Sequence, residues 1–136
     1  MEVQHRHVLV VDDDADIREM ITLVLEMDGS VVTSIASGHD AITYLHGCRD
    51  LPDLMVLDLD LGDMTGEELM VALCQHDDWC NIPIVLMSGS SRLAQTAGLL
   101  SVPVYVPKPF DPIALQAVVK QHARPTRASP DVAREV

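Results

Sequence analysis

The stretch His7-Val8-Leu9-Val10-Val11-Asp12-Asp13-Asp14 decides how this chain folds. Its apolar, valine-rich half predicts a short strand that is buried on both faces, as in a parallel sheet covered by helices. The three aspartates that follow place negative charge directly after that strand. Further strands of this kind would bring their polar ends to one edge of the sheet.

The same unit of strand and helix recurs along the chain. Residues 15–27 have an amphipathic helical pattern, and the β-branched residues 30–35 predict a second strand. Ser37 and Asp40 then have capping-box spacing at the start of the next helix. The remaining strands are predicted at residues 54–57, 82–87 and 103–106, and the remaining helices at residues 65–75, 91–100 and 111–122.

This alternation of five strands and five helices predicts an α/β fold. The expected architecture is an open, doubly wound, five-stranded parallel sheet with helices on both faces. Ligands in such folds bind beyond the carboxyl ends of the strands, at the point where the strand order switches. Residues 123–136 show no periodicity and are interpreted as a C-terminal tail or linker.

Composition argues against several classes of function. The chain has 9 basic and 21 acidic residues and a formal net charge of −12, which opposes direct binding to nucleic acid. No apolar run approaches the ~20 residues that a membrane span requires. Cys48, Cys74 and Cys80 lack close metal-ligand spacing, and the first residues do not resemble a signal peptide. We therefore expect a soluble, cytoplasmic protein with reduced thiols.

Polar side chains stand directly after four of the predicted strands. They are Asp12, Asp13, Asp58, Ser88 and Lys108. In the expected sheet these groups converge on one crevice. Three carboxylates brought together would repel one another unless a cation lay among them, and hard oxygen ligands favour Mg²⁺ or Mn²⁺. A divalent metal site is therefore expected at this edge.

The same residues suit the transfer of a phosphoryl group. A carboxylate such as that of Asp58 can attack phosphorus and form an acyl phosphate, which leaves positioning and charge neutralisation to its neighbours. Lys108 is a compact cation suited to an anionic oxygen. The Ser88 hydroxyl offers one donor that could follow a newly arrived phosphoryl group.

Five separated elements make the chain similar to a known family. They are Val8-Leu9-Val10-Val11-Asp12-Asp13, Asp58 with Leu59, Leu61 and Gly66, Ser88-Gly89, Tyr105, and Lys108-Pro109-Phe110. In this order and spacing they resemble the receiver domain of two-component response regulators, over residues 6–122. The resemblance implies a flavodoxin-like sheet with strand order 2-1-3-4-5. It also implies a cytoplasmic phosphoprotein that is no enzyme beyond catalysing its own phosphorylation and dephosphorylation.

The resemblance assigns roles to the site residues. Asp58 would accept a phosphoryl group from a sensor histidine kinase or a phosphotransfer protein. The carboxylates of Asp12, Asp13 and Asp58 and the backbone carbonyl of Asp60 would hold Mg²⁺ or Mn²⁺. Lys108 would pair with the phosphoryl oxygens. The peptide bond between Lys108 and Pro109 would be cis, which only an X-Pro bond adopts at a tolerable cost.

Ser88 and Tyr105 would form a switch pair by the same resemblance. The hydroxyl would move toward the phosphoryl group, and the ring would turn inward. Together they would reshape the face made by the fourth helix, the fifth strand and the fifth helix. An unidentified downstream protein, or a second copy of the chain, would bind to that face.

Some residues depart from the family pattern or carry no assigned role. Gly62 stands where the family usually has proline, which leaves the acceptor loop more flexible. The side chain of Asp60 could repel an incoming anion, help to order water or point to solvent. The fourth helix is expected to be short or shifted. His5 and His7 are interpreted as exposed side chains, and Trp79 as a ring packed over the end of the sheet.

Two alternative functions remain open at this point. The chain could be a receiver-like docking or dimerisation module that works without phosphorylation. The motif Asp58-Leu59-Asp60 also resembles the D-x-D motif of haloacid-dehalogenase-type phosphohydrolases. Against that enzyme, the motif follows two complete strand and helix units, no cap domain is present, and Asp12 and Asp13 would be unexplained.

Overall fold

The computed structural model describes residues 5–124 of the chain. Its strands are β1 (His7–Val11), β2 (Val31–Ile35), β3 (Leu54–Asp58), β4 (Ile84–Ser88) and β5 (Tyr105–Pro107). All strand pairs are parallel, and the order across the sheet is β2-β1-β3-β4-β5. The doubly wound α/β fold and its strand order are therefore confirmed.

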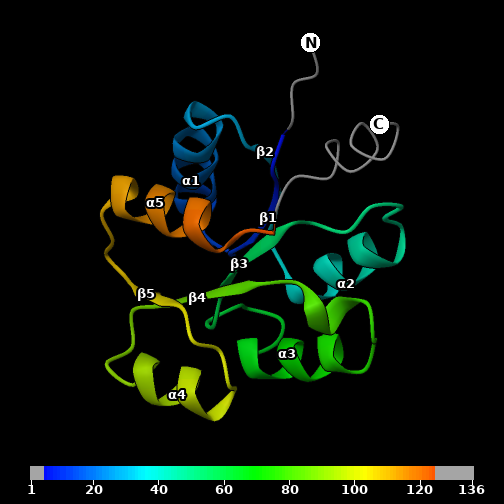
Figure 1. Ribbon diagram of the computed structural model, residues 1–136. Helices are drawn as coiled ribbons and strands as arrows, with labels where there is room; N and C mark the ends of the chain where they lie inside the picture. Colours follow the sequence, from blue (N-terminus) through cyan, green and yellow to red (C-terminus); the bar gives the residue numbers. More distant parts are fainter. Residues whose placement is uncertain (1–4, 125–136) are drawn as a thin grey trace.

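Helices cover both faces of this sheet (Figure 1). They are α1 (Ala15–Met27), α2 (Gly38–His46), α3 (Gly66–Cys74), α4 (Leu93–Leu99) and α5 (Pro112–His122), with a 3₁₀ turn η1 (Trp79–Asn81). Helices α1 and α5 lie on one face, and α2 and α3 lie on the other. Since α1, the longest, has 13 residues, no helix in the described part of the chain could cross a bilayer.

The core divides into two layers because side chains alternate along each strand. Val8 and Val10 of β1 pack in one layer with residues of α1 and α5, such as Ile21 and Leu115. The second layer holds the alternate strand residues, among them Leu9, Val11, Met55 and Leu57, with residues of α2, α3 and α4. Every residue of β3 is buried, as expected for a strand at the centre of a covered sheet.

Helix boundaries follow local capping signals. The Asp14 carboxylate caps α1 by accepting from the N–H groups of Asp16 and Ile17. Ser37 caps α2, and Thr65 and Glu68 form a reciprocal capping box at the start of α3. In α5 the cap is Asp111, followed by Pro112 at the first helical position.

The structure differs from the sequence prediction near the sheet edge. β4 begins at Ile84 rather than at residue 82, and β5 covers residues 105–107 rather than 103–106. Pro107 fits in β5 because this strand is at the edge, where one side of its backbone needs no partner strand. Helix α4 is short, with 7 residues.

The structure tests the predictions for two aromatic residues, His7 and Trp79. His7 is not an exposed terminal side chain as predicted, because its Nε2 lies 3.1 Å from Thr33 Oγ1 and 3.2 Å from the Tyr44 hydroxyl. The prediction was wrong because Thr33 and Tyr44 are distant in sequence. Trp79 is packed as expected, with only 6% of its surface exposed, and its ring stacks on His76 at 3.7 Å.

Gly66 allows the loop after β3 to pack closely on the site. A Cβ at this position would lie 2.7 Å from the Leu59 Cα, which is one residue from Asp58. We expect Gly66→Ala to lower the free energy of unfolding by about 1 to 3 kcal/mol, because backbone must move to admit the methyl group. Urea unfolding measures this change.

Gly98, inside α4, is the matched control. A Cβ there meets nothing within 4 Å, so Gly98→Ala should stabilise the protein by about 0.5 to 1 kcal/mol through helix propensity. Equal effects of the two substitutions would show that close packing at Gly66 is not the constraint.

Candidate functional site

The carboxyl ends of β1, β3, β4 and β5 meet at one edge of the sheet. Asp58 pairs with Met87 of β4 in the strand register, and Ser88 pairs with Pro107 of β5. The ladder continues past the strands, since Lys108 N–H donates to the Ser88 carbonyl at 2.9 Å. The parallel register therefore places polar residues from four strands side by side.

Lys108 contacts two buried carboxylates. Its Nζ lies 2.8 Å from Asp12 Oδ2 and 3.3 Å from Asp58 Oδ2. Asp12 is 0% exposed and Asp58 is 2% exposed. One ammonium group thus joins the strand that carries Asp12 to the strand that carries Asp58.

The pKa of Asp58 lies above its ordinary value. Burial is the largest cause, and the negative charge of Asp12 adds to it. The Asp60 backbone N–H, which donates to Asp58 Oδ1 at 3.1 Å, and the charge of Lys108 act in the opposite direction without cancelling the effect. The site therefore has less positive charge than its carboxylates require.

The carboxylates around Lys108 also change its pKa. Burial alone would lower the pKa of Lys108, but the hydrogen bond from its ammonium to Asp12 and the charges of Asp58 and Asp12 raise it above its ordinary value. The ammonium is therefore firmly charged and available to an anionic oxygen.

The carboxylates fit a divalent cation. One oxygen each from Asp12, Asp13 and Asp58 lies within 4.8 Å of the others, with Asp13 exposed and the other two residues buried. Three hard oxygen donors at this spacing match the preference of Mg²⁺ or Mn²⁺. The backbone carbonyl of Asp60 stays a predicted ligand.

Ser88 is buried, with 1% of its surface exposed, and its hydroxyl is engaged. Its Oγ donates to Asp60 Oδ2 at 3.1 Å and accepts from the Ser90 N–H at 3.0 Å. The Asp60 side chain thus contacts the predicted switch residue. Sequence reasoning left its direction open, because no local pattern links residues 28 positions apart.

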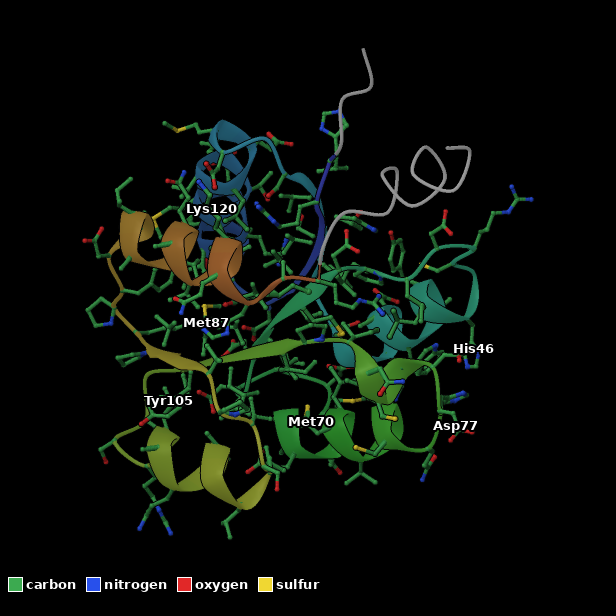
Figure 2. All side chains as sticks on the ribbon, viewed as in Figure 1. His46, Met70, Asp77, Met87, Tyr105 and Lys120 are labelled. Carbon is green, nitrogen blue, oxygen red and sulfur yellow. The ribbon has the colours of Figure 1, made fainter. Side chains whose placement is uncertain are left out.

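Tyr105 stands apart from these groups. Figure 2 shows it on β5, on the side of the molecule where α4 lies. Its side chain is exposed at 43%, so its ring is turned outward. The Lys108–Pro109 bond that follows this strand is cis.

Two supporting residues were not found from the sequence. Arg18 of α1 donates from Nη1 to the Asp12 carbonyl at 2.7 Å and so orients the loop that carries the acidic pair. Asp63 accepts from the backbone N–H groups of Gly38 and His39 at 3.0 and 2.9 Å. The His39 N–H holds the pKa of Asp63 well below its usual range, and the Gly38 N–H and the His39 ring add to the effect. This contact ties the loop after β3 to the start of α2.

Comparison with protein families identifies the chain. Residues 8–120 match the family described as "Response regulator receiver domain". The chain belongs to this family. The phosphohydrolase alternative finds no support, because the match covers nearly all of the described receiver domain.

Curated relatives and solved structures agree. The chain is 35% identical over 126 residues to the DNA-binding response regulator MtrA of Mycobacterium tuberculosis, a match that covers 91% of this chain and 53% of MtrA. It is 31% identical to a 14.6 kDa protein of Leptolyngbya boryana, covering 85% of this chain and 88% of that protein. The chain spans about half the length of several curated relatives that it matches.

Among solved structures, the chemotaxis response regulator CheY4 of Vibrio cholerae superimposes with a TM-score of 0.78 at 25% identity, covering 86% of this chain and 98% of CheY4. A response regulator receiver protein from Pseudomonas putida gives a TM-score of 0.77 at 25% identity, covering 88% and 99%. The receiver fold is thus shared over nearly the whole length of both neighbours.

Replacing Asp58 by asparagine should stabilise the metal-free receiver domain, because it removes a buried charge whose pKa is raised. We expect a gain of about 1 kcal/mol at pH 7, or a rise in Tm of roughly 3 °C.

The pH dependence of this gain follows from the pKa of Asp58, which is higher in the folded chain than its value near 3.8 in the unfolded chain. The native chain therefore loses stability as the pH rises from the unfolded pKa through the folded pKa. The advantage of Asp58→Asn should therefore be present at pH 7 and disappear toward the acidic end. Thermal melts across this pH range test it, with the exposed Asp13→Asn as control; a lower Tm for Asp58→Asn would contradict the argument.

Mg²⁺ should stabilise the native domain by mass action, since its ligands come together only on folding. At ten times Kd the expected gain is about 1.4 kcal/mol. Asp13→Asn should weaken this response, whereas Glu67→Gln, which removes the same charge from α3, should preserve it. Calorimetric melts against Mg²⁺ concentration provide the measurement. An unchanged Mg²⁺ response in Asp13→Asn would argue against the site.

Proposed function

We propose that this receiver domain accepts a phosphoryl group on Asp58 from a sensor histidine kinase or a histidine phosphotransfer protein. The observation that carries the proposal is the placement of the Asp58 carboxylate. It is buried at the carboxyl end of β3, 3.3 Å from Lys108 Nζ and among the oxygens of Asp12 and Asp13. Membership of the receiver family supports the same role.

The chain's own groups orient the reaction. Asp60 N–H holds Asp58 Oδ1 at 3.1 Å, and Lys108 Nζ lies 3.3 Å from Oδ2, so both oxygens of the nucleophile are oriented. A carboxylate oxygen forms a bond to phosphorus as the bond from phosphorus to the donor imidazole nitrogen breaks, and the electron pair stays on that nitrogen. A bound Mg²⁺ would neutralise charge on the phosphoryl oxygens.

Lys108 and Ser88 then act on the product. The Lys108 ammonium pairs with a phosphoryl oxygen, and the Ser88 hydroxyl becomes a donor to another. We also propose that the domain catalyses only its own phosphorylation and dephosphorylation and is not an enzyme beyond that. We propose that residues 6–122 make up this functional unit, and α5 ends at the last of them, His122.

The output is proposed to be a protein-interaction face made by α4, β5 and α5, which lie along one side of the molecule in Figure 1. Leu99, Tyr105 and Ile113 are large apolar residues exposed on these three elements. A downstream protein or a second copy of the chain would bind there once Tyr105 turns inward. The net charge of −12 argues that this domain itself does not contact DNA, although MtrA is named as a DNA-binding regulator. A cytoplasmic location is part of the same proposal.

Incubation with acetyl phosphate or phosphoramidate and Mg²⁺ should add one phosphoryl group to the native chain. Intact mass should rise by about 80 Da, the mass of the group itself, because Asp58 forms an acyl phosphate. Asp58→Asn and a chelated sample of the native chain should show no gain. Absence of a gain with any donor would favour the docking-module alternative, and continuous turnover of phosphorylated small molecules would favour a phosphohydrolase.

A further inference from the structure

The Ser88 hydroxyl has one proton to donate, and it is already in use. A serine offers a single O–H donor. In this structure that donor points to Asp60 Oδ2 at 3.1 Å. The Ser90 N–H holds the same oxygen from the other side at 3.0 Å. The hydroxyl is therefore fixed between a carboxylate and a backbone amide within a side chain that is 1% exposed.

The proposed switch requires that the Ser88 hydroxyl donate its proton to a different acceptor. A phosphoryl group on Asp58 would need the hydroxyl of Ser88 as a donor, so the bond to Asp60 must break first. The Ser88 backbone is held by the N–H of Lys108 at 2.9 Å, and its strand is paired with β3 and β5. The rearrangement thus falls on the hydroxyl and the loop after it rather than on the strand.

Asp60 is well placed to oppose that rearrangement. Its backbone N–H donates to Asp58 Oδ1 while its side chain accepts from Ser88, so one residue touches both the acceptor and the switch. A hydrogen bond to a carboxylate is roughly twice as strong as one between neutral groups.

We propose that the Asp60 carboxylate is a latch that holds the Ser88 hydroxyl in the unphosphorylated position and so lowers the sensitivity of the domain to phosphorylation. Asp60 is a positioning residue in this account, because it acts through Ser88. The inference rests on the proposed function, and it differs from the two other roles open to this side chain. Simple repulsion of an anion would not pass through Ser88, and ordering of water would alter hydrolysis alone.

The first test measures the affinity of the Mg²⁺-loaded full chain for beryllofluoride, a stand-in for the phosphoryl group that is not hydrolysed. Asp60→Ala removes both the charge and the acceptor and should tighten binding by roughly tenfold. Asp60→Asn removes the charge but keeps an acceptor oxygen, so a smaller gain is expected. Glu67→Gln is the matched control, because Glu67 lines the same 770 Å³ cavity as Asp60 and Ser88 but belongs to α3. Its change should stay within about twofold.

A double-mutant cycle then separates the latch from repulsion. In a Ser88→Ala background the latch has no donor, so Asp60→Ala should change the affinity no more than Glu67→Gln does. A full tenfold gain in that background would overturn the proposal in favour of repulsion. An unchanged affinity accompanied by altered hydrolysis of the phosphorylated chain would overturn it in favour of water ordering.

The amide of Ser90 reports the latch without any phosphoryl group, since its N–H donates to the Ser88 oxygen. In Asp60→Ala its NMR resonance should move toward the position that it takes in the native beryllofluoride complex. A resonance that stays at the native position would overturn the latch. The proposed function fails differently: a native chain that binds neither beryllofluoride nor a phosphoryl group overturns it together with the latch, whereas normal phosphorylation with a silent Asp60→Ala overturns the latch alone.

Discussion

The structure depends on one partly buried cation, the Lys108 ammonium, that faces more negative charge than it can neutralise. Lys108 joins Asp12 and Asp58 at 2.8 and 3.3 Å, while Asp13 adds a third carboxylate at the mouth of the same site. Burial raises the pKa of Asp58 and so makes its charged form costly. The two apolar layers of the core supply the stability that allows the sheet to carry this imbalance. The same imbalance would favour a divalent cation among the three carboxylates.

The proposed phosphorylation of Asp58 would require that the surrounding groups be positioned before a phosphoryl group arrived. The parallel register provides the coarse placement, because it brings the ends of four strands to one edge. Contacts between the loops and the helices α1 and α2 provide the fine placement. Arg18 holds the Asp12 carbonyl at 2.7 Å, and Asp63 fastens the loop after β3 to the first N–H groups of α2. Neither residue touches the reacting atoms, yet both orient groups that would.

A short series of hydrogen bonds links Asp58 to the loop before α4. Asp60 contacts Asp58 through its N–H and Ser88 through its carboxylate, and Ser88 in turn binds the N–H of Ser90 at the start of the loop that leads to α4. A change in the partner of one hydroxyl would therefore be felt by the loop before α4 and then by the face that carries Tyr105. This arrangement would allow the proposed phosphorylation to change the surface of the domain while the sheet stayed in place.

The sequence by itself determined the alternation of strands and helices, the helix caps and the convergence of Asp12, Asp13, Asp58, Ser88 and Lys108, because periodicity and capping are local and parallel strands end at one edge. Only the tertiary structure decided the bond between Asp60 and Ser88, the anchoring of Asp63 on α2 and the contacts of His7 with Thr33 and Tyr44. Each of these contacts joins a side chain to a segment that is far away in the sequence. Their formation depends on how loops pack after the sheet has assembled, and no local pattern of residues encodes that geometry.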